Sequence, residues 1–223
     1  MAVTIEEKIK QGRQYRSMLL ECRDAKDADS YITEGYATTY DEPYTLYSWD
    51  NLEFREVIDN HAFDKCDMSD VIMQYDHEGR VFARTKNGTL TLASDTHGLK
   101  VVADLSGTSE GRKLYEEIKG GYTSKMSFGF IVGADETLIE EKNGKTVYTR
   151  TIKEIKKLFD VSAVSIPAND ATEISARSFL DGVIEAKKLE QEKRAAEEKQ
   201  KEKDIEQEKR RRAAVLLSWN LSK

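Results

Sequence analysis

The run KMSFGF around Ser127 constrains this chain more than any other stretch, because apolar and small polar residues alternate along it. Successive side chains of a β-strand point to opposite faces. Met126, Phe128 and Phe130 therefore share one face, which is suited to a hydrophobic core. Ser127 and Gly129 share the other, and Gly129 leaves room for a second backbone beside the serine hydroxyl. The pattern fits a serine nucleophile, or an ordinary serine on the solvated face of an edge strand.

Short strands dominate the expected secondary structure. Runs rich in β-branched and aromatic residues predict strands at 31–40, 52–58, 71–75, 82–84, 89–93, 99–105, 125–130 and 158–169. Asn87-Gly88 and Asn143-Gly144 each predict a two-residue hairpin turn. A helix is expected over Gly111–Lys119, capped by Ser109 and ended by Gly120. These elements predict an α+β, mainly β fold, in which a mostly antiparallel sheet or barrel carries packed helices.

Both ends of the chain are expected to be helical. Thr4 and Glu7 have the spacing of a capping box, and the apolar residues that follow predict a helix or two interrupted near Gly12. The tail is rich in helix-forming Glu, Lys, Arg, Ala and Gln, but it has too few apolar residues for a sustained coiled coil. A single solvated helix and a half-disordered extension both remain open. We therefore divide the chain into an N-terminal helical segment (1–30), a domain (31–179) and a long charged helical tail (180–223).

Composition and charge exclude several classes of protein. The formal net charge is -6, and because the tail carries 12 basic and 10 acidic residues, the acidic excess lies in the body. An acidic body argues against a nucleic-acid partner. No apolar run is long enough for a transmembrane helix, so no membrane partner is expected. The two cysteines lack CxxC spacing and fit a reducing cytoplasm, and with three scattered histidines they predict no metal site and no cofactor.

A serine nucleophile needs a general base, and histidine is the usual one. This chain has three histidines. His61 and His97 fall in polar turns, where histidine is a common surface residue. His77 directly follows the apolar strand 71–75, and the end of a buried strand is a rigid mount with an exposed tip. His77 is therefore the best candidate for the base of Ser127.

The third member of such a site is a carboxylate that orients the imidazole. Asp160 lies inside an otherwise apolar strand, where a charge is costly unless it is paired. It either pairs with His77 or faces solvent at alternate positions with Ser162. Lys125 offers a serine–lysine alternative, which ranks below His77 because an exposed lysine is a poor base.

Several short motifs, taken in order, resemble the prohead maturation proteases of tailed phages. The resemblance covers roughly 31–178, and the ordered set is more specific than any single member. The motifs are EGYA (34–37), HAFD (61–64), YDH (75–77), GLKV (98–101), GYTSKMSFGF (121–130) and FDVSAVSIPAN (159–169).

This resemblance implies a serine endopeptidase related in fold to the herpesvirus assembly protease. Such an enzyme would cleave scaffold, or a scaffold-like segment of the capsid protein, inside the procapsid that assembles in the host cytoplasm. The correspondence makes His77 the base and Ser127 the nucleophile. Asp160 stands where the family commonly has an acidic residue, usually Glu. The sequence leaves open whether the tail is removed by self-cleavage and whether the chain forms a homo-oligomer.

Two non-catalytic functions are alternatives to the protease interpretation. A procapsid scaffold or portal-associated protein on a related β-fold would also carry a charged helical tail, and labelling of Ser127 by a serine-directed probe would argue against it. A β-barrel tube or baseplate protein needs no histidine–serine pair. A large separation between His77 and Ser127 would favour that second reading.

Overall fold

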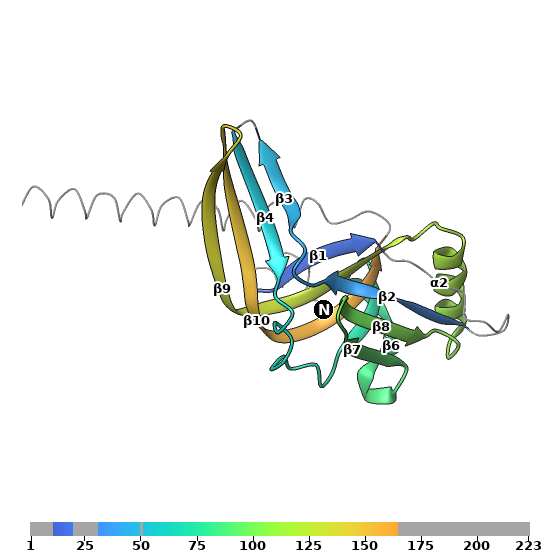
Figure 1. Cartoon of the computed structure of the whole chain (residues 1–223). Coiled ribbons are helices and arrows are strands. Elements are labelled where there is room, and N and C mark those ends of the chain that lie inside the picture. The colour runs from blue at the N-terminus through green and yellow to red at the C-terminus, as the bar shows by residue number, and fades with distance from the viewer. Residues whose placement is uncertain (1–10, 20–30, 50, 165–223) are drawn as a thin grey trace, which may run out of the picture. The chain divides into compact units, whose positions relative to one another are not determined.

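The computed structural model describes residues 11–19, 31–49 and 51–164 of the 223-residue chain (Figure 1). The chain divides into two compact units, 1–176 and 177–223, and every described residue belongs to the first. Strands make up most of the described residues, with one α-helix and one short 3-10 helix among them. The predicted capping box and the predicted helical tail lie outside the described residues, and the domain boundaries remain a prediction.

The larger sheet contains seven strands and carries the run around Ser127. Five of them follow the order β1 (Gln14–Leu19), β9 (Lys125–Lys142), β10 (Lys145–Val164), β4 (Leu52–Ile58) and β3 (Tyr44–Trp49). The remaining two are β5 (Ile72–Tyr75), which pairs with β10, and β6 (Glu78–Arg84), which pairs with β5. Only the pairings of β10 with β4 and β5 are parallel, so the mostly antiparallel prediction is confirmed for the described residues.

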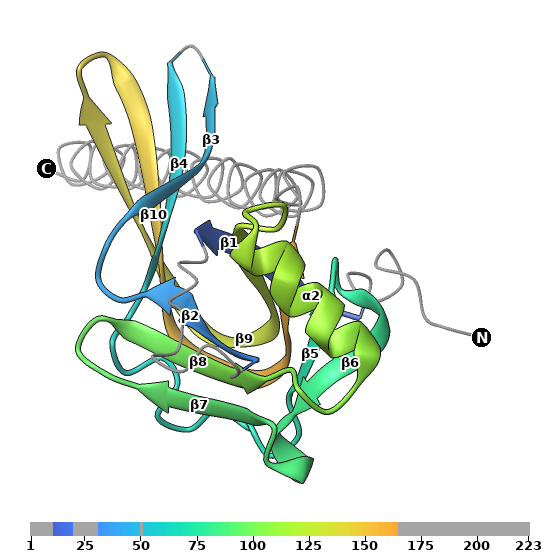
Figure 2. The same cartoon turned by 90° about the vertical axis from the view of Figure 1, so that its right-hand side faces the viewer.

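The smaller sheet has three antiparallel strands, in the order β2 (Ile32–Thr39), β8 (Gly98–Asp104) and β7 (Leu90–Ser94). The 3-10 helix η1 (Thr85–Asn87) leads from β6 to β7. The helix α2 (Ser109–Lys119) follows β8 and buries Leu114, Tyr115 and Ile118. Figure 2 shows α2 beside β6, away from the β3–β4 end of the larger sheet.

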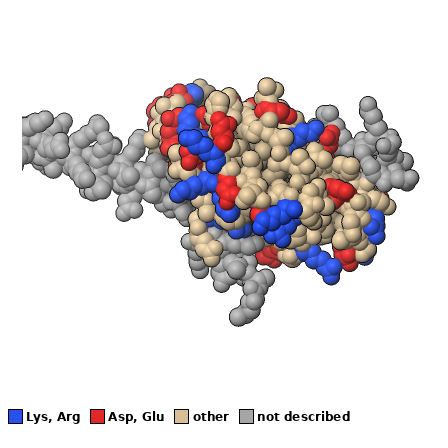
Figure 3. Space-filling model, turned by 90° about the horizontal axis from the view of Figure 1, so that it is seen from below, with Lys and Arg blue, Asp and Glu red and all other residues tan. Residues whose placement is uncertain are grey.

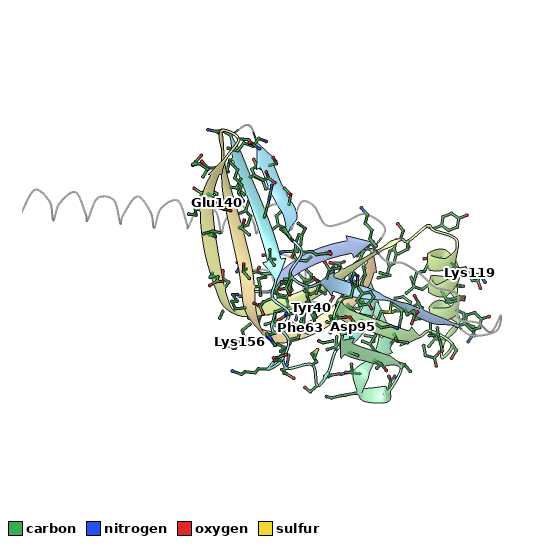
Figure 4. All side chains as sticks on the ribbon, in the orientation of Figure 1. Tyr40, Phe63, Asp95, Lys119, Glu140 and Lys156 are labelled. Carbon is green, nitrogen blue, oxygen red and sulfur yellow. The ribbon has the colours of Figure 1, made fainter. Side chains whose placement is uncertain are left out.

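The hydrophobic core is built from both sheets and from α2. Phe128 and Phe130, from the apolar face predicted for β9, are fully buried and their rings stack 4.7 Å apart. Tyr40 and Phe63 lie close together near the middle of the molecule, with ring centroids 6.2 Å apart (Figure 4). Each buried phenylalanine side chain stabilises the fold by roughly 1.5–3 kcal/mol relative to exposure. This core therefore holds β9 firmly from one side.

The distal ends of β9 and β10 form an arm with β3 and β4, which extends away from the smaller sheet (Figure 1). Asn143 and Gly144 join β9 to β10 with positive φ angles of 53° and 76°, which confirms the second predicted hairpin. On the face drawn in Figure 3, basic and acidic side chains of the described residues are interspersed.

Three sequence predictions need correction. The described part of the predicted N-terminal helix, Gln14–Leu19, is a strand, because its backbone pairs with β9 in an antiparallel ladder. Asn87-Gly88 does not close a hairpin, because Gly88 ends η1 and the strands on either side belong to different sheets. The hydroxyl that caps α2 is that of Thr108, which accepts the Gly111 N–H at 2.9 Å, and the helix begins at Ser109.

Candidate active site

Ser127 lies on β9 between two other strands. In the antiparallel ladders, Ser17 of β1 is opposite Ser127 on one side and Ser162 of β10 on the other. The serine is fully buried. The predicted alternative, a serine on the solvated face of an edge strand, is therefore wrong.

His77 lies in the two-residue turn that joins β5 to β6. Tyr75 and Glu78 pair across this turn, and Asp76 and His77 have positive φ angles of 47° and 60°. Such angles define a type I′ turn, in which Asn-Gly is preferred. A residue with a β-carbon costs roughly 1–2 kcal/mol in this conformation, and strain of this kind is typical of functional sites. The Asp76 N–H donates to the carbonyl of Ala163 at 3.0 Å, which ties the turn to the end of β10.

Asp160 lies on β10, opposite Gly129 of β9 and Ile72 of β5. Its side chain is 1% exposed. The oxygen Oδ1 accepts hydrogen bonds from His77 Nδ1 and from Ser162 Oγ, the latter at 3.1 Å. The expectation that Asp160 and Ser162 face solvent together is therefore wrong, and the alternative of a buried pair with His77 describes the structure.

The three residues form one hydrogen-bonded line. The Asp160 carboxylate accepts the hydrogen on Nδ1 of His77, which leaves Nε2 as the acceptor for the Ser127 hydroxyl at 2.6 Å. A serine, an imidazole and a carboxylate in this order form the arrangement that serine hydrolases use to activate a nucleophile. Ser127 and His77 are separated by 50 residues in the sequence, and His77 and Asp160 by 83.

The other candidate bases lie elsewhere. His61 is exposed and bonds to Asp64 at 2.9 Å, and His97 packs its ring against Tyr36 in an exposed turn. Lys125 is half-buried two residues before Ser127. The base that is hydrogen-bonded to the serine is His77, which argues against the serine–lysine alternative.

Sequence reasoning missed the contribution of β1 to this site. The ring of Tyr15 meets the imidazole of His77 edge-on, with centroids 4.3 Å apart. Arg13 Nη1 lies 3.6 Å from Asp160 Oδ2. The only signal for this strand was a few apolar residues, which the sequence analysis attributes to a helix. Gly129 was expected to leave room for a backbone, but the space above it is occupied by Asp160 and Tyr15 side chains.

Buried charge around the site is balanced by specific partners. Burial raises the pKa of the Tyr15 hydroxyl to about 12, with a further increase from the charge of Asp160 and an opposing effect from Arg13. On the neighbouring part of the sheet, burial alone would raise the pKa of Glu56. The charges of Arg16 and Arg150, together with hydrogen bonds from Arg16 and Tyr44, outweigh that effect, so the pKa lies below its ordinary value.

Within the described ranges, no group of three or more His, Cys, Asp or Glu side chains could hold a metal ion. The search for a helix of sufficient length and hydropathy to cross a membrane also found none there.

Comparison with known proteins agrees with the class that this geometry defines. The family model of the caudovirus prohead serine proteases matches residues 19–185, and the chain therefore belongs to that family. Membership implies a serine peptidase of the phage prohead. No curated protein matches the chain, and no solved structure matches it either.

Proposed function

We propose that this chain is a serine endopeptidase that cleaves scaffold protein, or a scaffold-like segment of the capsid protein, during procapsid maturation. The observation that carries the proposal is the 2.6 Å hydrogen bond between Ser127 Oγ and His77 Nε2, continued through Nδ1 to Asp160. Neither a tube or baseplate protein nor a scaffold needs a hydrogen-bonded serine, histidine and carboxylate. In such proteins the backbone strain at His77 would have no function.

The reaction begins when His77 Nε2 takes the hydroxyl proton of Ser127 and Oγ attacks the peptide carbonyl. The imidazolium then donates this proton to the leaving amine, and an acyl-enzyme remains on Ser127. Water, deprotonated by the same imidazole, attacks the ester and releases the acid. Asp160 holds the imidazole in the tautomer that this sequence of steps needs and stabilises its protonated form. Backbone N–H groups directed at the developing oxyanion complete such a site.

The site is closed as it stands. Ser127 has no exposed surface, His77 is 2% exposed and Asp160 is 1% exposed. A peptide carbonyl therefore reaches Oγ only after neighbouring groups move. Opening on encounter with substrate is common among enzymes whose catalytic groups must be kept from water.

The test is co-expression of the full chain with its cognate capsid and scaffold proteins, followed by mass measurement of all products. We compare wild type, Ser127→Ala, His77→Ala and the control Ser106→Ala, which removes an exposed loop hydroxyl. Wild type and the control should give the same fragments, and the other two variants should give none. The same masses report whether the tail is removed by self-cleavage. Processing by Ser127→Ala at the wild-type rate would overturn the proposal.

A fluorophosphonate provides a second measurement that needs no substrate. The reagent should attach to Ser127 of wild type and leave Ser127→Ala unmodified, with the site identified by peptide mass. Circular dichroism spectra of wild type and Ser127→Ala should coincide, which checks that both proteins have the same fold. A folded wild-type chain that never reacts would favour the scaffold alternative.

A further inference from the structure

The strand β1 is anchored beside the site by a buried ionic cluster. Arg16 donates to both carboxylate oxygens of Glu56, at 2.5 and 2.8 Å, and Arg150 donates to the same carboxylate at 3.2 Å. These three side chains are at most 5% exposed. Bidentate arginine–carboxylate pairs combine strong attraction with fixed geometry. The cluster therefore fixes where the residues just before Arg16 lie.

Two of those residues contact the candidate triad. Tyr15 lies opposite Gly129 in the ladder and packs its ring against His77. Arg13 lies at the entry to β1, with its guanidinium 3.7 Å above the ring of Phe159 and 3.6 Å from Asp160 Oδ2. Its side chain is 18% exposed, so its charge is only partly screened by water.

The two oxygens of Asp160 have different surroundings. Oδ1 accepts hydrogen bonds from His77 and Ser162. Oδ2 is buried and accepts no hydrogen bond among the described residues, and the cation beside it is Arg13. A buried carboxylate oxygen is costly unless an opposite charge compensates it. The same two charges act on Tyr15: burial raises the pKa of its hydroxyl most, the charge of Asp160 raises it further and Arg13 lowers it.

We propose that Arg13 is a positioning residue for the candidate triad, and that its charge sets the pH range in which His77 can act as a base. The guanidinium keeps Oδ2 turned away from the imidazole, so that Oδ1 remains directed at Nδ1. It also offsets part of the Asp160 charge, which limits how strongly the carboxylate favours the imidazolium. This proposal rests on the proposed function, because it assigns a role within the same reaction.

The other groups around His77 do not supply this charge. Ser127 of β9 and Tyr15 of β1 are neutral near pH 7, and Asp160 of β10 is the carboxylate itself. Asp76 and Glu78, which flank His77 in the turn, are acidic. Arg13 is thus the cation that faces the pair among the described contacts.

The test measures the rate at which a fluorophosphonate modifies Ser127 in the full chain between pH 5 and 9. Removing the charge with Arg13→Gln should move the acidic limb of the rate profile to higher pH by about 0.5–1 unit, the size expected for a nearby, partly exposed charge. Arg13→Lys keeps the charge and should stay close to wild type. Arg55→Gln removes a partly exposed, paired arginine on β4 and should leave the limb unchanged.

The outcomes separate this proposal from the one it rests on. An unshifted limb in folded Arg13→Gln, or an equal shift in Arg55→Gln, would overturn the role of Arg13 while Ser127 remains the nucleophile. Arg13→Met removes the charge but keeps an apolar stem over Phe159, and it replaces Arg13→Gln if that variant does not fold. Absence of any reaction at Ser127 in wild type would instead remove the proposed function itself.

Discussion

Gly129 lies directly opposite Asp160 in the β9–β10 ladder, and the carboxylate occupies the space where a side chain of Gly129 would stand. A β-carbon added there would lie 2.5 Å from Asp160 Oδ2 and 2.8 Å from Tyr15 Cε1. Because Gly129 has no side chain, the Asp160 carboxylate can pack directly over β9, the strand that carries Ser127.

We predict that Gly129→Ala lowers the rate of Ser127 modification at least about 100-fold, because displacing a catalytic group by about 1 Å has costs of this order. Asp160 and Tyr15 are both packed and must shift together. Gly133→Ala is the matched control on the same strand, where the three atoms nearest to the new β-carbon all belong to the side chain of Glu154. Fluorophosphonate kinetics measure both variants, and equal rates for the two would contradict this account.

The strained turn predicts an unusual order of stabilities. Both His77→Gly and His77→Ala remove the imidazole and should be inactive. Glycine adopts a φ of 60° without strain, whereas alanine does not. We therefore expect the glycine variant to be more stable by about 1 kcal/mol, the reverse of the usual order. Urea denaturation measures the difference, and a more stable alanine variant would show that the turn relaxes once the imidazole is gone.

The buried cluster around Glu56 predicts a loss of stability in acid. Because its two arginine partners, outweighing the effect of burial, hold the pKa of Glu56 below its ordinary value, the ionised form stabilises the folded state. This contribution is complete above the unfolded pKa of about 4.5 and is lost as the pH falls through the lower folded value. Glu56→Gln should cost about 3–5 kcal/mol at pH 7, since it leaves two buried arginines without their carboxylate.

Denaturation measured from pH 7 to pH 3 checks this prediction. The difference between wild type and Glu56→Gln should shrink below about pH 4.5. Glu53→Gln, on the same strand but with a more exposed arginine pair, should follow wild type throughout. A constant difference across the pH range would show that the loss comes from packing and not from charge.

Cys66 should react slowly despite being a free thiol. Burial raises the pKa of Cys66 to about 11, and the charge of Asp67 adds to this effect. Only the thiolate is nucleophilic, so alkylation by iodoacetamide at pH 8 should be roughly 100-fold slower than for an ordinary cysteine. The measurement uses a Cys22→Ser background, with the urea-unfolded chain as the reference. A rate equal to that of the unfolded chain would contradict the burial of this side chain.

Local patterns in the sequence predicted several of the strands, and they selected the three side chains that the structure brings together at the candidate site. The alternation around Ser127 identified the buried face of β9, and Asn143-Gly144 identified the hairpin of the arm. His77 was selected because it follows an apolar strand, and Asp160 because a charge in such a strand needs a partner. These features depend on neighbours in the chain, which the sequence displays directly.

What depended on distant partners was not predictable. Gln14–Leu19 has an apolar pattern too short to distinguish a strand from a helix, and only its ladder with β9 decides between them. The positions of Arg13 and Tyr15 follow from that ladder. The local sequence left a solvated edge open for Ser127, because its burial results from strands contributed by both earlier and later parts of the chain.

The occupied flanks of β9 have a consequence for substrate selection. In many peptide-binding sites the ligand adds to the edge of a sheet as a further strand. Its main-chain hydrogen bonds then supply affinity that does not depend on its sequence. Beside Ser127 this mode is closed, because Ser17 and Ser162 already hold the neighbouring ladder positions. If the proposed function holds, we expect a polypeptide to cross the sheet face on which His77 stands. We then expect the protein to select its cleavage sites mainly by the side chains of the substrate, and less by main-chain pairing with an extended segment.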